Sequence, residues 1–106
     1  MTVHESTLQE IVAKIVQLAN PDRVILFGSA AAGSMTPDSD LDFLVVESQV
    51  PDTRRESIRL RAALEGVPLP IDVIVMSRQR FEETKDVIGG IAYPAHKYGR
   101  VLYEAA

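Results

Sequence analysis

The stretch ILFGSAAAGSMTPDSDLDFLVV, residues 25–46, contains two apolar runs joined by a loop of small and turn-forming residues. The first run ends at Gly28-Ser29, and the second begins with Asp40 and Asp42, which alternate with apolar residues. Because successive side chains of a strand point to opposite faces, the two carboxylates share one face and their apolar neighbours share the other. The pattern predicts two buried strands, with a pair of carboxylates where the second begins.

Composition sets the limits within which this pair must be interpreted. The chain has 106 residues, of which 46% are hydrophobic and 25% charged, which suits a single globular domain over 1–106. A net charge of −4 argues against direct nucleic-acid binding, which rests on many contacts from Lys and Arg to phosphate. The absence of cysteine excludes disulfides and zinc-finger sites. No apolar run approaches the ~20 residues that span a membrane, so we expect a cytoplasmic protein.

Apolar periodicity and capping residues predict five helices. They cover residues 6–19, 30–32, 53–64, 78–88 and 91–98. The expected end signals are a capping box of Ser6 with Gln9, a second of Thr53 with Glu56, Gly66 as a C-cap and Ser77 as an N-cap.

Short apolar runs bounded by Gly, Pro and Asp predict four strands. They cover residues 24–27, 41–47, the end of the run PLPIDVIVMS (68–77) and 100–104. Helices alternate with these strands along the chain, apart from two consecutive helices before the last strand. The order predicts an α/β (α+β) fold, a small mixed β-sheet covered by helices.

A third carboxylate, Asp72, lies between apolar residues of the third strand. If this strand neighbours the second, Asp40, Asp42 and Asp72 meet at one point. Such anions repel one another and cost folding energy unless a cation lies between them. Oxygen ligands of this kind suit Mg²⁺ or Mn²⁺, whose coordination is completed by water and substrate phosphates.

Gly28-Ser29 lies where a strand turns into a short helix, and backbone N–H groups are unpaired at such a place. The glycine allows a ligand to approach closely, and the serine hydroxyl adds a donor for phosphate oxygens. An anion site beside a metal site indicates a nucleoside triphosphate held through its phosphates.

Each of these residues also has a simpler structural interpretation. Taken singly, Asp40 could cap a turn, and Asp42 or Asp72 could be a surface residue of a strand. The run DSDLDF begins like an EF-hand loop, but it has phenylalanine where the turn glycine is required. GSAAAGS lacks the lysine of a P-loop. The arginines at 54, 55, 59 and 61 are expected to form the solvated side of a helix.

The sequence GS, ten residues, DLD and a later DV resembles the minimal nucleotidyltransferase (MNT) family of the DNA polymerase β superfamily. The resemblance extends through IAYPAHKYGRVLYE and implies a nucleotidyltransferase fold. It implies that Gly28 and Ser29 hold the triphosphate of ATP, and that Asp40 and Asp42 bind two Mg²⁺ ions. Asp72 would complete one metal site beside the attacking hydroxyl, and Ser39 is a further candidate for phosphate contact.

Family members of this size lack an acceptor-binding domain and resemble antitoxins paired with HEPN ribonuclease toxins. The resemblance therefore implies a protein adenylyltransferase that moves AMP from ATP to a tyrosine of a HEPN-type toxin or another helical partner, in a hetero-oligomer. Two alternatives stay open. The chain could be a non-catalytic binding antitoxin or nucleotide-sensing module, or the catalytic subunit of a small-molecule nucleotidyltransferase.

One position departs from the family pattern. Many relatives read Gly-Ser-x-Ala-Arg-Gly, and this chain has Ala32 in place of the arginine. Because the alanine cannot pair with phosphate, we expect weakened nucleotide binding unless another cation replaces the guanidinium. Arg78, Arg80 and Lys85 are the candidates after the third strand.

Overall fold

The structure is a computed structural model that describes residues 3–36 and 38–106; Pro37, in the predicted loop, lies outside the described residues. Its elements follow one another in this order along the chain: α1 (Glu5–Ala19), β1 (Arg23–Phe27), α2 (Ser29–Ala32), β2 (Leu41–Glu47), α3 (Thr53–Ala63), β3 (Ile71–Ser77), α4 (Arg78–Thr84), α5 (Ala92–Tyr98) and β4 (Arg100–Glu104). All four predicted strands and all five predicted helices are present.

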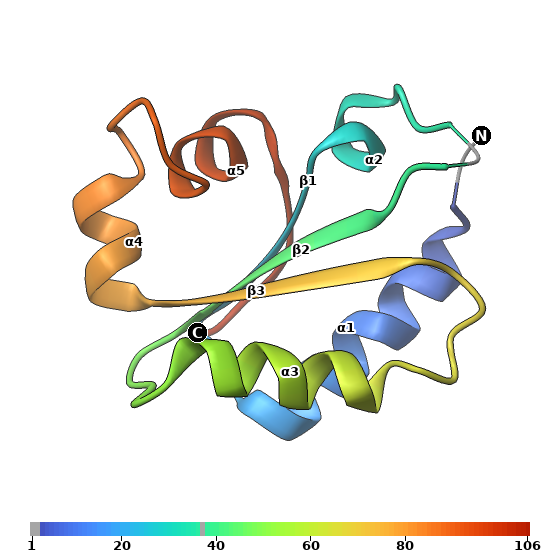
Figure 1. Cartoon of the computed structure of the whole chain (residues 1–106), viewed down its shortest axis with the longest axis horizontal. Helices are drawn as coiled ribbons and strands as arrows, with labels where there is room; N and C mark the ends of the chain where they lie inside the picture. The colour runs from blue at the N-terminus through green and yellow to red at the C-terminus, as the bar shows by residue number, and fades with distance from the viewer. Residues whose placement is uncertain (1–2, 37) are drawn as a thin grey trace.

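The four strands form one sheet in the order β3-β2-β1-β4. Strand β1 runs antiparallel to both β2 and β4, whereas β2 and β3 are parallel, so the sheet is mixed as predicted. Helices α1 and α3 cover one face and α4 and α5 cover the other (Figure 1). The parallel pair is joined through α3, which is the usual way to connect parallel strands.

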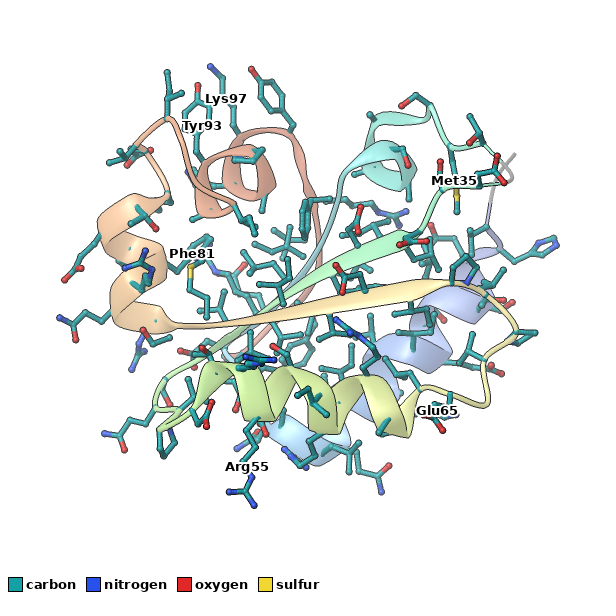
Figure 2. The ribbon with its side chains drawn as sticks, in the orientation of Figure 1. Met35, Arg55, Glu65, Phe81, Tyr93 and Lys97 are labelled. Atoms are coloured by element: carbon teal, nitrogen blue, oxygen red, sulfur yellow. The ribbon has the colours of Figure 1, made fainter. Side chains whose placement is uncertain are left out.

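Each face of the sheet buries its own apolar cluster. On the α1 and α3 side, Leu41, Phe43 and Val45 of β2 pack with residues of both helices. On the other side, Leu44 and Val46 pack with Phe81, whose ring fills the space between α4 and the sheet (Figure 2). Because β2 is buried on both faces, its sequence is nearly all apolar, and Asp42 at its start is an exception.

Two predicted N-terminal capping boxes are wrong. Helix α1 begins at Glu5, and His4 is its N-cap without a side-chain hydrogen bond. Helix α3 begins after Asp52, whose carboxylate accepts a hydrogen bond from the Arg55 N–H at 3.0 Å. Aspartate is as good an N-cap as serine or threonine, so the cap lies one residue before the predicted one and Thr53 is the first residue of the helix.

Two predicted C-terminal ends also differ. Helix α3 is capped by Leu64 in a conformation that is not left-handed, so Gly66 is not its C-cap. Helix α4 begins at the predicted cap, where the Ser77 hydroxyl accepts from the Arg80 N–H at 3.2 Å. It ends at Thr84 instead of 88, because the Val87 N–H bonds to the Thr84 carbonyl in a tighter turn.

None of the helices in the described part of the chain has both the length and the apolar character needed to span a bilayer.

Candidate active site

Strand register places two of the predicted carboxylates side by side. Asp42 of β2 is the direct partner of Asp72 in the parallel strand β3. Paired residues of neighbouring strands point to the same face of the sheet. Both carboxylates therefore lie on the face that α4 and α5 cover further along, where Leu44 and Ile74 follow them at a spacing of two.

Asp40 lies just before β2 and is exposed. The Leu41 N–H, next in the chain, bonds to the Pro70 carbonyl at 2.9 Å and ties the start of β2 to the start of β3. Asp40 is therefore held at the end of the sheet where Asp42 and Asp72 lie. Its negative charge contributes to the raised pKa of Asp42.

Gly28 brings the glycine-serine turn against this pair. Its backbone has φ 73° and ψ −153°, a region that is essentially restricted to glycine. A Cβ atom added at Gly28 would lie 2.4 Å from Oδ2 of Asp42, closer than any real contact allows. The chain approaches the carboxylate this closely because position 28 has no side chain. The two sequence motifs, separated by ten residues, are thus in direct contact.

Asp42 and Asp72 differ in the charges that surround them. The pKa of Asp42 is raised, first by burial and then by the negative charges of Asp72 and Asp40. Asp72 is paired with Arg61 of α3, which donates to its Oδ1. The structure thus supplies a cation to Asp72 and leaves Asp42 among like charges, which favours binding of a further cation there.

The carboxylates do not form a closed ligand set. Among residues 3–36 and 38–106, no three His, Cys, Asp or Glu side chains are grouped closely enough to bind a metal by themselves. Asp40 lies before the strand, and Arg61 already binds Asp72. Mg²⁺ commonly uses one or two protein carboxylates and completes its coordination with water and substrate phosphates. The donor set therefore fits a hard divalent ion that binds together with a triphosphate.

The predicted phosphate-contacting residues differ in their surroundings. The first intrahelical hydrogen bond of α2 runs from the Ala32 N–H to the Gly28 carbonyl at 3.1 Å. The Ser29 N–H belongs to the first turn, before this bond, and has no partner within the helix. The Ser39 hydroxyl accepts from the Thr36 N–H at 2.9 Å and thereby stabilises the loop before β2. Gly28 places Ser29 next to the carboxylates, and phosphate contact by Ser29 and by Ser39 stays a prediction.

Sequence reasoning missed Arg61 and expected other cations. Arg78 pairs with Asp22 at 3.4 Å and Lys85 with Glu82 at 2.8 Å, on the helix that follows the far end of β3. Arg78, Arg80 and Lys85 all follow the end of β3, whereas Asp72 is the second residue of that strand. This position does not favour them as replacements for the family arginine, and phosphate contact by any of them stays a prediction.

The predicted solvated arginine face of α3 is correct in part. Arg55 points away from the sheet into solvent (Figure 2). Arg59 instead donates to both carboxylate oxygens of Glu56 at 2.7 and 2.8 Å and to the Leu18 carbonyl of α1 at 3.1 Å. Arg61 binds Asp72. Arg61 follows Ser57 by four residues, so both lie on the same face of the helix. Because Ser57 contacts β3, this spacing could have identified Arg61 as facing the strand.

The site is open to solvent: Asp40 and Gly28 are exposed, and the Asp72 side chain retains 39% of its accessible surface. A hollow of about 540 Å³ lies elsewhere, between α1 and β4, and includes none of the candidate residues. The candidate site is therefore identified by its acidic side chains and by the turn at Gly28. The size of a hollow would point to another part of the surface.

Comparisons with known proteins agree with this geometry. Residues 6–93 match the family model described as "Nucleotidyltransferase domain". The fold is similar to the crystal structure of a Sulfolobus solfataricus protein assigned as a nucleotidyltransferase, with a TM-score of 0.64 and 19% identity over 93% of this chain and 78% of that chain. No curated protein matches the chain significantly. The structural match confirms the expected fold.

Proposed function

The chain belongs to the nucleotidyltransferase domain family, and from this premise we propose that it transfers AMP from Mg²⁺-bound ATP to a hydroxyl group of a partner protein. Nucleotidyl transfer in general follows from the family. The nucleotide, the metal and the acceptor are our proposal. The observation that carries it is the contact of the Gly28 turn with Asp42, beside Asp72.

In this proposal Asp40, Asp42 and Asp72 hold the divalent ions, which would stabilise negative charge on the reacting phosphate oxygens. Gly28 leaves space for the phosphate chain, and the Ser29 N–H and hydroxyl donate to its oxygens. The acceptor oxygen forms a bond to the α-phosphorus, the bond to the β-phosphate oxygen breaks, and pyrophosphate leaves. Asp72, partly exposed on the edge strand, is positioned to orient the acceptor hydroxyl and accept its proton.

A protein acceptor is supported by exposed apolar residues on the sheet face that carries the site. Ile88 in the connection between α4 and α5 is 81% exposed, and Tyr98 at the end of α5 is 65% exposed. This segment covers the sheet face on which Asp42 and Asp72 lie. Exposed apolar residues on the same face as an open site suit the docking of another protein. The MNT resemblance implies that this protein is a HEPN-type toxin and that its acceptor is a tyrosine.

The test is transfer of label from α-phosphate-labelled ATP. The protein, a candidate HEPN-type helical partner and Mg²⁺ are incubated together, with the Asp42→Asn variant and a chelator as controls. We expect label on the partner with wild-type protein and Mg²⁺, and no label with the variant or in the presence of the chelator. Label on an added small-molecule alcohol instead would favour a small-molecule nucleotidyltransferase. Inhibition of the partner without any label would favour an antitoxin that acts by contact.

A further inference from the structure

Arg61 is a basic residue that the fold brings to the carboxylates. Its Nη2 group donates to Oδ1 of Asp72, and 51% of the Arg61 side chain remains exposed. The contact follows from how α3 packs on β3. The Ser57 hydroxyl accepts from the Val75 N–H at 3.0 Å, and Arg61 lies one helical turn further on, toward the beginning of the strand.

This pairing conflicts with the role proposed for Asp72. A guanidinium and a divalent ion on the same carboxylate repel each other, and both draw on its negative charge. A metal that binds between Asp42 and Asp72 therefore weakens the ion pair of Asp72 with Arg61 and favours its release. Since α3 stays anchored through Ser57, the released guanidinium remains beside the site. The triphosphate that enters with the metal is then the anion nearest to it.

We propose that Arg61 is an exchangeable counter-ion that binds Asp72 in the free protein and transfers to the phosphates of the bound nucleotide. This inference rests on the proposed function. It also supplies a phosphate-binding cation to a chain that has Ala32 where many relatives have arginine. Guanidinium groups pair with phosphate oxygens through parallel charge-assisted hydrogen bonds, which an alanine cannot provide.

Two binding measurements on Arg61→Gln test the exchange, because they are expected to change in opposite directions. Mn²⁺ titrated calorimetrically without nucleotide should bind about fivefold more tightly than to wild type, because the competing ion pair is removed. A non-hydrolysable ATP analogue in saturating Mg²⁺ should bind about tenfold more weakly, because a charge-assisted contact is lost. Arg61→Lys retains the charge but not the planar guanidinium. Its affinities for Mn²⁺ and for the ATP analogue should both lie between those of wild type and Arg61→Gln.

Arg55→Gln is the matched control. It removes the same charge from the same helix, but its side chain points away from the sheet (Figure 2). We expect wild-type affinities for both ligands. Weaker binding of both ligands by Arg61→Gln would indicate a structural role and overturn the inference.

The outcomes also separate the inference from the proposed function. If wild type binds Mn²⁺ through Asp42 but Arg61→Gln binds it no more tightly, the exchange alone is refuted. If wild type binds neither Mn²⁺ nor the nucleotide, and Asp42→Asn behaves identically, the proposed function and the inference both fail.

Discussion

Two single residues give the candidate site its shape and its charge: Gly28, which has no side chain, and Asp42, whose carboxylate lies among like charges. Gly28 contributes no side chain, and this allows the turn to contact Asp42. Among residues 3–36 and 38–106, no cation is paired with Asp42, and the cost of its charge to the fold favours cation binding. A single substitution at Gly28 or at Asp42 changes one of these features, so each can be tested separately.

Gly28→Ala should abolish nucleotide transfer, because the new Cβ atom would displace the Asp42 carboxylate. We also expect the free energy of unfolding to fall by about 1–3 kcal/mol, since the backbone conformation excludes other residues. Gly33→Ala is the control: φ is 74° there, but no atom lies within 4 Å of an added Cβ. It should lose about 1 kcal/mol and retain activity. Urea denaturation and the transfer assay measure both effects, and equal loss of activity would contradict the contact argument.

Asp42→Asn should separate stability from function. The folded-state pKa of Asp42 is raised, so the ionised form is disfavoured in the fold, and the cost is complete above that pKa. At pH 7 the substitution removes this cost, and metal-free protein should be as stable as wild type or up to about 1 kcal/mol more stable. Stabilisation by Mg²⁺ with ATP should disappear. Thermal melts with and without ligand test this; Asp38→Asn, in the exposed loop, should melt like wild type in both conditions.

At the scale of elements, α3 is the helix whose attachment matters to the site. The Ser57 hydroxyl fixes it to the edge strand β3, and Arg59 links it to the last turn of α1. In the first turn of α3, next to Ser57, Glu56 faces Glu47, which terminates β2 and is 7% exposed. The attachment therefore includes the Glu47 carboxyl group, whose pKa is raised to about 7, beside Glu56, whose pKa is lowered by its hydrogen bond with Arg59.

The pH dependence of stability should reveal this pair. Burial, reinforced by Glu56, raises the pKa of Glu47 from 4.5 to about 7. The native state therefore retains a proton that the unfolded state loses, and stability falls as the pH rises from about 4.5 to about 7. Glu47→Gln should remove this fall and exceed wild type by on the order of 2 kcal/mol at pH 8.

Denaturation curves between pH 5 and 8 measure the effect. Glu65→Gln, an exposed carboxylate at the end of α3, is the control and should follow wild type across the range (Figure 2). A constant difference between Glu47→Gln and wild type would show that the Glu47 carboxyl does not titrate in this range.

At the scale of the whole molecule, the proposed reaction requires a second protein to reach an open site. The carboxylates lie at one end of the sheet, and α5 lies further along the same face (Figure 1). Tyr93 and Lys97 project from α5 away from the sheet, with the Lys97 ammonium 3.0 Å from the Tyr93 hydroxyl (Figure 2). The exposed apolar residues of this segment are therefore accompanied by polar groups, as in a protein interface.

Ile88→Asp should reduce labelling of the partner at least tenfold without changing ATP affinity. The physical reason is that docking would bury an apolar side chain, which contributes about 1.5–3 kcal/mol. Ile58→Asp is the matched control, because Ile58 is also exposed but lies on α3, which covers the opposite face of the sheet. Labelling of the partner and calorimetry with ATP measure the two effects. Equal loss of labelling by both variants would place the docking surface elsewhere.

The sequence by itself determined the local features of this protein. Periodicity within single runs predicted every strand and helix, and alternation put Asp40 and Asp42 on one face beside the Gly28-Ser29 turn. Helix ends were less predictable: Asp52 and Thr53 are both good N-caps, and α3 ends at Leu64, before the glycine that usually marks a C-terminus.

Only the tertiary structure decided which distant residues meet. The strand order β3-β2 paired Asp72 with Asp42, and the packing of α3 on β3 brought Arg61 to Asp72 and buried Glu47 beside Glu56. No local pattern encodes these contacts, because strand order and helix docking depend on how complete apolar faces pack together. The candidate ligands could therefore be predicted from the sequence, whereas the arginine that pairs with one of them could not.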